Sequence, residues 1–310
     1  MDQVAIFMKI ESLVKKYGQN LAVDKVDLNI CQGEIFGLVG PDGAGKSTLL
    51  RLMSLLVSPT SGKIEILRKN MINNSKIFKK SICYLSQGLS LYEDLTVWEH
   101  LVFTAKLYGI SQKKFFNIVS QLMKRINLGD HLNKLAGELS GGLKQKLALM
   151  CCLLPEPEAL FLDEPNTGVD PLSRREFWQL LYEINQDGVT VVISTSYMDE
   201  AELCHRLAFM HKGKIIALGT SEELKENFSQ KIYELTASDP RQIYGQTDLL
   251  KNHFYIRVQG EAIRLVCEAD IYSKEEIIQK LKEFKISFIS LRSIEPNMED
   301  VFMFKLRTLA

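Results

Sequence analysis

The sequence predicts an α/β domain built on a largely parallel sheet, followed by a smaller α+β module. Three short segments, 35–39, 159–162 and 189–193, are almost wholly apolar and alternate with helix-like patterns. Strands of this composition are buried on both faces, which is typical of parallel sheets covered by helices. After Gly219 the pattern changes to closely spaced strand-like segments, so we expect a second module there.

The first half of the chain also predicts two subdomains beside the parallel sheet. Residues 4–30 alternate in short stretches on both sides of a turn at 17–20, which predicts paired antiparallel strands. Residues 95–135 are mostly helical in pattern, and another helix is expected to begin near Gly141. A helix is also expected from Ser47 onward, where apolar side chains recur at helical spacing, namely Leu49, Leu52, Met53 and Leu56.

The C-terminal segment reads as a small module of its own. Its expected strands are 231–237, 253–259, 262–269 and 285–294, and its expected helices are 241–251, 273–284 and 298–305. The order strand, helix, strand, strand, helix, strand is that of a ferredoxin-like fold. We therefore place one domain at 1–222 and an accessory α+β domain at 223–310.

Bulk properties exclude several classes of protein. Lys plus Arg and Asp plus Glu both total 38, so the chain lacks the basic excess of most nucleic-acid-binding proteins. No stretch of about 18 apolar residues predicts a membrane span, and the acidic start does not resemble a signal peptide. The six cysteines show no CxxC spacing, and we expect free thiols in a reducing cytosol.

The segment 40–48, GPDGAGKST, fits the phosphate-binding loop G-x-x-x-x-G-K-[ST] and lies between a predicted strand and a predicted helix. Glycines let backbone N–H groups turn inward around phosphates, and the following helix N-terminus adds partial positive charge. A chance glycine-rich turn is the alternative, and the strand–loop–helix context argues against it. The expected nucleotide-binding residues are Gly40, Pro41, Asp42, Gly43, Ala44, Gly45, Lys46, Ser47 and Thr48.

A second motif, EALFLDEP at 158–165, places two carboxylates at the end of an apolar strand. The carboxyl ends of strands are where α/β sheets bind ligands. Asp163 is expected to hold Mg²⁺ with Ser47, and Glu164 to accept the proton of an attacking water. Together the two motifs indicate a P-loop ATPase, with ATP and Mg²⁺ as cofactors.

The segment 139–147, LSGGLKQKL, resembles the signature peptide of ABC ATPases. The resemblance extends over nearly the whole chain through STSYMDEAE and the terminal EPNMEDVFMFKL, and is greatest to bacterial drug-exporter and multidrug ATPases. It implies that Ser140, Gly141 and Gly142 bind the ATP held by an opposite subunit in a head-to-tail dimer. It also implies a separately encoded membrane permease, an export function and a peripheral position on the cytoplasmic face of the inner membrane.

Other positions acquire roles from the same resemblance. Tyr17 occupies the place of the ring that stacks on adenine, with core packing as the alternative. Gln87 matches a glutamine that touches Mg²⁺ and water, and Asp170 matches the aspartate of the dimer-contact loop. The segment 91–109 looks like the helical subdomain that contacts the permease. We expect Trp98 and Phe103 there to be core residues, with direct contact to the permease as the alternative.

The sequence departs from the family pattern at Asp42, Leu143 and Ser196. The first two are mild changes. Ser196 stands where a histidine normally contacts the γ-phosphate, and His205 is too far along the chain to replace it. Two functions therefore stay open: an ATP-driven transport motor, or an ATP-dependent switch that relies on a competent partner. Translation-factor and DNA-repair relatives are disfavoured, because the chain lacks their second ATPase half, coiled-coil inserts and zinc-binding cysteines.

Overall fold

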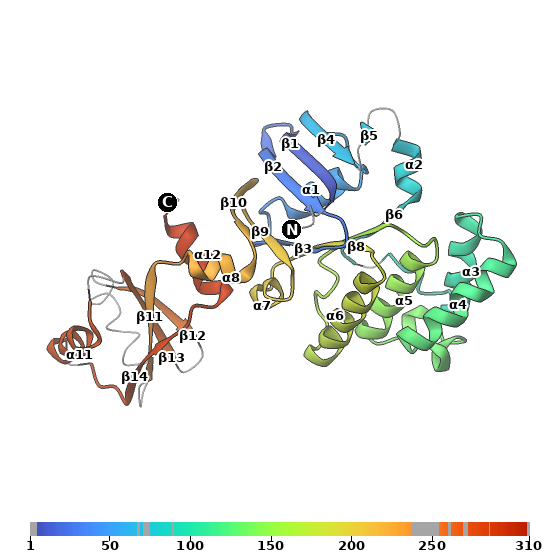
Figure 1. The fold of residues 1–310 in the computed structure, drawn as a ribbon. Helices are drawn as coiled ribbons and strands as arrows, with labels where there is room; N and C mark the ends of the chain where they lie inside the picture. The colour runs from blue at the N-terminus through green and yellow to red at the C-terminus, as the bar shows by residue number, and fades with distance from the viewer. Residues whose placement is uncertain are drawn as a thin grey trace. The chain divides into compact units, whose positions relative to one another are not determined.

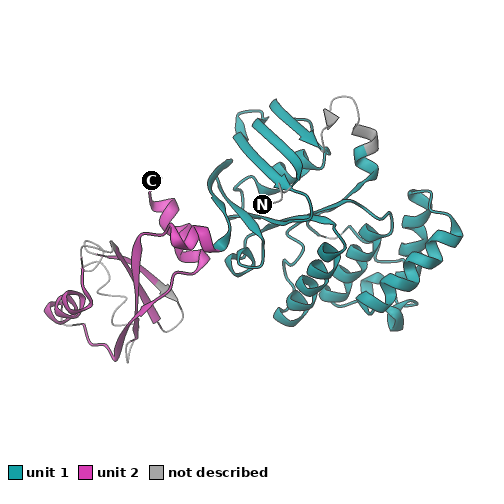
Figure 2. Cartoon of the chain, viewed as in Figure 1, with its two compact units in different colours: residues 1–221 teal, residues 222–310 magenta. Residues whose placement is uncertain are grey.

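The computed structural model describes residues 5–66, 69–70, 75–88, 90–236, 254–259, 262–268, 272–284 and 286–308. The chain divides into two compact units, residues 1–221 and residues 222–310 (Figure 2). Each unit has a hydrophobic core cluster drawn only from its own residues. Each is described separately below.

A six-stranded sheet forms the centre of the first unit (Figure 1). Its order is β10-β9-β3-β8-β7-β6, with parallel neighbours except for the antiparallel β9–β10 hairpin. Strands β3, β7 and β8 are buried along their full length, so the prediction of a largely parallel, covered sheet is confirmed. The strands are β3 (Ile35–Val39), β6 (Ile82–Leu85), β7 (Ala159–Asp163), β8 (Thr190–Thr195), β9 (Arg206–His211) and β10 (Lys214–Gly219).

A four-stranded antiparallel sheet of order β2-β1-β4-β5 forms the predicted β subdomain. Its first two strands pair around a tight turn that contains Gly18 in the left-handed region, with φ of 58°. The helix α1 (Lys46–Met53) contacts β2 of this sheet as well as β7 and β8 of the central sheet. The strands are β1 (Ile6–Tyr17), β2 (Asn20–Cys31), β4 (Ser61–Ile66) and β5 (Lys69–Asn70).

Helices cover the face of the central sheet opposite α1 and extend beyond β6 (Figure 1). The helices α3 and α4 form the predicted helical subdomain, and Thr96 begins α3 with a capping box to Glu99. The helices of this unit are α2 (Ser75–Lys80), α3 (Val97–Leu107), α4 (Gln112–Ile126), α5 (Gly141–Leu153), α6 (Pro171–Gln186) and α7 (Met198–Ala201), with short 3₁₀ turns at Gly129–His131 and Ala136–Glu138. The helix α8 (Ser221–Glu226) lies almost wholly in the second unit. No helix in the described ranges is both long and apolar enough to cross a membrane.

Two expectations for this unit are wrong: that Phe103 is a core residue, and that the helix after Ser47 extends to Leu56. Phe103 is 45% exposed on α3, where its ring lies edge-on to that of Tyr92, which is itself 56% exposed. Leu56 is 54% exposed, because α1 ends at Met53 and Leu55 takes a left-handed conformation that turns the chain away. Trp98 is half-buried and packs against Phe115 and its neighbour on α4.

The expectation that every cysteine is a free thiol is also wrong. Cys83 on β6 and Cys152 on α5 form a disulfide between elements that lie against each other. The two residues are 69 positions apart, so no local spacing pattern could reveal the pair. The remaining four cysteines are free, as expected: Cys31, Cys151, Cys204 and Cys267.

The second unit contains a four-stranded antiparallel sheet of order β12-β13-β11-β14. Both α11 and α12 begin with a capping box, from Ser273 and Asn297 respectively. The predicted helix at 241–251 lies outside the described residues. The elements are β11 (Gln230–Thr236), β12 (Tyr255–Gln259), β13 (Ala262–Glu268), α11 (Lys274–Glu283), β14 (Ser290–Ile294) and α12 (Met298–Arg307).

Candidate functional site

The loop 40–48 connects β3 to α1, and its glycines are required by close packing. A Cβ atom on Gly40 would overlap the carbonyl oxygen of Met210, and one on Gly45 would overlap that of Ala22. Gly43 and Gly45 also have φ of 76° and 105°, a conformation that favours glycine. The turn between β9 and β10 fixes the loop from outside, since the N–H of Gly213 donates to the carbonyl of Ala44 over 2.9 Å.

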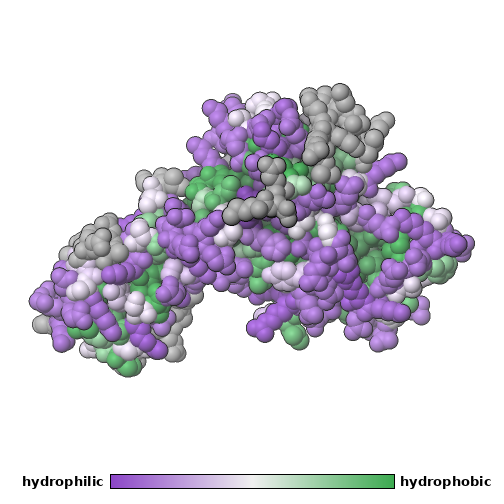
Figure 3. Space-filling model, in the orientation of Figure 1, coloured by the Kyte–Doolittle hydropathy of each residue, from purple (hydrophilic) through white to green (hydrophobic). Residues whose placement is uncertain are grey.

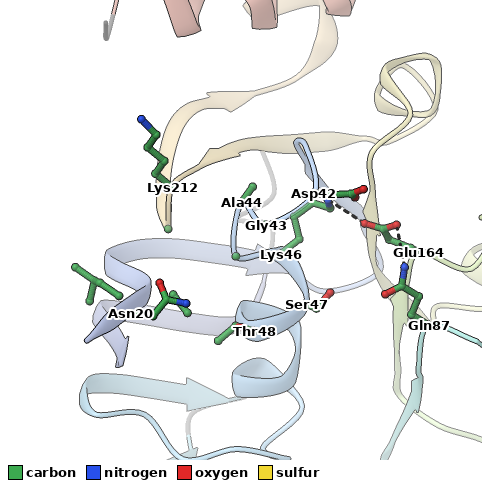
Figure 4. A pocket seen from close by; sticks show the side chains of 14 residues that line it. Asn20, Asp42, Gly43, Ala44, Lys46, Ser47, Thr48, Gln87, Glu164 and Lys212 are labelled. Carbon is green, nitrogen blue, oxygen red and sulfur yellow. Dashed lines mark hydrogen bonds and ion pairs between the residues drawn. The ribbon is translucent and has the colours of Figure 1, made fainter. Parts of the chain in front are cut away.

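This loop borders a cavity of about 480 Å³ (Figure 4). Four segments that are distant in sequence close it: the start of β2, the β9–β10 turn, and the residues that follow β6 and β7. Sequence reasoning identified the loop, Gln87 and Glu164 but missed Asn20, Leu21, Ala22, Lys212 and Gly213. The lining residues are Asn20, Leu21, Ala22, Asp42, Gly43, Ala44, Gly45, Lys46, Ser47, Thr48, Gln87, Glu164, Lys212 and Gly213.

Lys46 is the buried cation of the cavity. Its ammonium donates to the carbonyls of Gly40 over 2.8 Å and Pro41 over 3.1 Å, so the lysine also holds the loop in shape. The same ammonium lies 2.9 Å from Oε1 of Glu164, and both side chains are less than a tenth exposed. The positive charge is therefore directed at the carboxylate across the cavity, as Figure 4 shows.

Asp163 ends β7 and is completely buried. Its Oδ1 accepts hydrogen bonds from the hydroxyls of Ser47 over 2.9 Å and Ser194 over 2.7 Å. Its Oδ2 accepts one from the phenol of Tyr84 over 2.8 Å. Burial raises the pKa of Tyr84 to about 12, which keeps that phenol protonated as a donor. Sequence reasoning missed Ser194 and Tyr84, because each comes from a neighbouring strand.

Glu164 follows Asp163 in a left-handed conformation, with φ of 47°. A glutamate in this region is uncommon, and such conformations cost about 1–3 kcal/mol and concentrate at functional sites. Ser194 of the adjacent strand holds the turn, since its carbonyl and its hydroxyl both accept from the N–H of Glu164. The turned carboxylate also accepts hydrogen bonds from Gln87 over 3.5 Å and Thr167 over 3.3 Å.

Ser196 lies one residue beyond β8, beside the end of β7, and is half-buried. The preceding carbonyl of Thr195 accepts from the N–H of Gly40, so this strand end lies against the phosphate loop. His205 is at the opposite end of the sheet, where its Nδ1 accepts from the N–H of Ile35 at the start of β3. It therefore does not occupy the place of a histidine at position 196.

The expected signature residues lie outside the cavity. Ser140 begins α5, and its hydroxyl accepts from the N–H of Leu143. Gly142 packs on α6 so closely that a Cβ atom there would overlap the hydroxyl of Ser173, whereas one on Gly141 would meet only ordinary contact. The same Ser173 donates its N–H to Asp170, which begins α6.

Two further predicted residues are exposed. Hydrogen bonds from the backbone and side chain of Ser173 lower the pKa of Asp170, so the carboxylate at the start of α6 stays ionised. Tyr17 ends β1 and is 47% exposed, with the ammonium of Lys15 5.0 Å from its ring centroid. It does not line the cavity, although Asn20 in the same hairpin does.

Comparisons with known proteins agree with this geometry. A family model described as ABC transporter matches residues 23–167. The chain is 32% identical over 308 residues to the Nod factor export ATP-binding protein I of Rhizobium sp. (strain N33), an alignment that covers 98% of this chain and 97% of that protein. The chain belongs to the family of ABC transporter ATP-binding proteins.

Two other comparisons extend the family relationship. This ABC ATPase is 42% identical over 218 residues to the probable multidrug ABC transporter ATP-binding protein YbhF of Escherichia coli (strain K12), which covers 70% of this chain and 38% of that protein. The chain therefore matches less than half of that relative's length. The dimeric post-hydrolysis structure of the ATP-binding cassette MJ0796, bound to ADP and Pi, aligns with a TM-score of 0.62 and 26% identity, covering 69% of this chain and 98% of that chain.

Proposed function

We propose that this ABC ATPase binds and hydrolyses ATP to drive export through a separately encoded membrane permease. One observation carries the proposal: the phosphate loop, Asp163 and Glu164 converge around Lys46 and Ser47, at the edge of one cavity. Export is the direction named for the Rhizobium relative, and YbhF is named as a multidrug transporter protein. Attachment to the permease gives the chain a peripheral position on the cytoplasmic face of the inner membrane.

The proposed roles follow from the chemistry of each group. The N–H groups of the loop and the ammonium of Lys46 bind the phosphates of ATP, and Tyr17 offers a ring to the adenine. Ser47, Asp163 and Gln87 supply the oxygen ligands that Mg²⁺ prefers, and the hydroxyl of Ser47 already lies 2.9 Å from Oδ1 of Asp163. When bound, Mg²⁺ supplies charge neutralisation at the phosphates. Glu164 accepts the proton of the attacking water.

A second copy or a related ATPase completes the site. Ser140, Gly141 and Gly142 open α5 away from the cavity of their own chain, so they are available to the γ-phosphate of a partner. Asp170 lies on the same face, because Ser173 joins it to Gly142. The related cassette MJ0796 is dimeric in its structure with ADP and Pi, which supports the pairing of two ATPase subunits.

The helical subdomain is the proposed contact surface for the permease. Figure 3 shows hydrophobic side chains gathered over α3 and α4 among hydrophilic ones. Tyr92, Phe103 and Phe116 are each at least 45% exposed there. Exposed hydrophobic side chains that gather on one surface are typical of an interaction site. Gln87 lies in the segment of the chain that joins β6 to α3 and is proposed to sense the permease.

The strand order of the second unit supports the ferredoxin-like assignment. Numbered 1 to 4 along the chain, its strands lie in the order 4-1-3-2 across the sheet, and each is antiparallel to its neighbours. We propose that residues 1–222 form the nucleotide-binding domain and residues 223–310 an accessory ferredoxin-like domain that stabilises the assembly rather than binding ATP.

The proposed function is tested by the ATP turnover of wild type and Ser196→His, each with and without the permease. Ser196 should make hydrolysis slow, because serine is too short to donate to the charge that develops on the γ-phosphate. Restoring one preorganised donor is expected to raise turnover by about 10²-fold. If neither protein hydrolyses ATP with its permease, the motor function is wrong. Equal, measurable rates would instead make the serine a neutral substitution, in which a bridging water suffices.

The same assay distinguishes the second candidate function. The assay favours an ATP-dependent switch if the wild type binds ATP without hydrolysing it, whereas Ser196→His hydrolyses it. That result would mean that the chain signals nucleotide occupancy to a partner ATPase, which performs the hydrolysis.

Deleting residues 222–310 is expected to leave ATP affinity within about twofold of the full chain. Every residue that lines the cavity lies at or before Gly213, and the core cluster around α1 uses residues of the first unit alone. Equilibrium titration with a fluorescent ATP analogue measures the affinity. Aggregation of the shortened chain would show instead that the second unit completes the fold of the first.

A further inference from the structure

Tyr84 hydrogen-bonds to the carboxylate of Asp163, the proposed metal ligand, and no sequence motif includes this tyrosine. It lies on β6, next to β7, and its phenol donates to Oδ2 of Asp163 over 2.8 Å. The guanidinium of Arg51 donates in turn to the phenol oxygen of Tyr84 over 3.3 Å. A phenol that both donates and accepts has a fixed direction, because its two partners leave the hydroxyl no free rotation.

Together with the bond from Ser47 to Asp163, these contacts connect four side chains in a ring: Ser47, Asp163, Tyr84 and Arg51. Ser47 and Arg51 are four residues apart on α1, so they project from the same face of the helix. Ser47 donates to Oδ1 of Asp163, while Arg51 reaches Oδ2 of the same carboxylate through Tyr84. The helix that follows the phosphate loop and the strand that carries Asp163 are thereby joined at two points.

The two oxygens of Asp163 have different partners. Oδ1 faces Ser47, the side on which the nucleotide cavity lies, whereas Oδ2 faces Tyr84. A metal ion at this site would take an oxygen lone pair of Ser47 as its ligand. The bonds from Ser194 and Tyr84 hold the carboxylate of Asp163 independently of that ligand.

We propose that Tyr84 is a positioning residue for Asp163, which fixes Oδ2 so that Oδ1 is presented to Mg²⁺. The inference rests on the proposed function, because it requires that Mg²⁺ is bound with nucleotide at Ser47 and Asp163. Hydrogen-bond partners of metal ligands commonly change metal affinity by about 10–100-fold when they are removed. Tyr84 touches neither nucleotide nor metal and acts through the carboxylate alone.

The test is a Mg²⁺ titration of nucleotide affinity in wild type and Tyr84→Phe, using a fluorescent ATP analogue. The matched control is Tyr182→Phe, which removes a phenol that donates over 2.6 Å to the carbonyl of Leu203, away from the cavity. Tyr84→Phe is expected to raise the Mg²⁺ concentration for half-maximal affinity about tenfold. Its affinity in EDTA should equal that of wild type, and Tyr182→Phe should match wild type in both conditions.

Two results would overturn the inference while leaving the proposed function intact. The first is an unchanged Mg²⁺ requirement in Tyr84→Phe. The second is an equal loss of affinity with and without Mg²⁺, which would give Tyr84 a merely structural role. A wild type that binds nucleotide without any Mg²⁺ dependence would overturn both proposals. If Tyr84→Phe unfolds, the exposed Arg51→Gln change tests the same ring and should raise the Mg²⁺ requirement in the same direction.

Discussion

Replacing Glu164 by glutamine is expected to slow ATP hydrolysis by at least about 100-fold without weakening ATP binding. The amide keeps the shape of the side chain but cannot accept the proton of the attacking water, and general-base catalysis typically contributes 10²–10⁴-fold. Binding should persist, because the phosphate contacts come from the loop and Lys46. The measurement is phosphate release in single-turnover conditions, together with equilibrium ATP binding.

The control for this change is Glu34→Gln, at the start of β3 and the opposite end of the sheet from the cavity. Glu34 is as buried as Glu164 and accepts from the N–H of Cys31 over 2.6 Å. Burial raises its pKa, and an amide can replace its acceptor role. Turnover in this control should match wild type. Normal hydrolysis in Glu164→Gln would remove Glu164 from the role of general base.

Replacing Lys46 by alanine is expected to lower ATP affinity by about 100-fold or more. Hydrogen bonds to charged groups contribute about 1.5–3 kcal/mol, and this ammonium is directed at the β- and γ-phosphates when ATP is bound. The change also removes the bonds that Lys46 makes to Gly40 and Pro41, so the loop loses part of its support. Fluorescence titration measures the affinity.

Lys212→Ala is the matched control, because Lys212 lines the same cavity from the β9–β10 turn. Its side chain is exposed and points away from the phosphate loop in Figure 4. Removing this charge should change affinity by less than about threefold, since exposed charges are well screened by solvent and salt. Near-normal binding in Lys46→Ala would show that the loop is not the ATP site.

The phosphate loop and the acidic strand end could be predicted because each is continuous in sequence. A glycine-rich turn between an apolar strand and a helix fixes the positions of Lys46 and Ser47 locally. The alternation of apolar strands with helices then predicts that Glu164 and Ser196 meet at the same end of the sheet. The pairing of β7 with β8 confirms that they do.

The residues that sequence reasoning missed all depend on contacts between distant segments. Lys212 and Gly213 reach the cavity because β9 and β10 form a hairpin that hydrogen-bonds to Ala44. Tyr84 contacts Asp163 only through the pairing of β6 with β7. Neither register is encoded by a local pattern. The prediction that Phe103 is a core residue failed because helical spacing does not reveal which face of α3 is covered by other segments.

We propose that this ABC ATPase works as a head-to-tail pair in which each signature binds the ATP of the other chain. Sedimentation of Glu164→Gln with Mg²⁺ tests it most directly, because this variant cannot consume the nucleotide that holds the pair together. We predict a dimer in ATP and a monomer in ADP. Adding Gly141→Asp should restore the monomer in ATP, since a Cβ atom there meets only ordinary contact in its own chain and the added carboxylate repels the partner's γ-phosphate. A monomer of Glu164→Gln in saturating ATP would contradict the account.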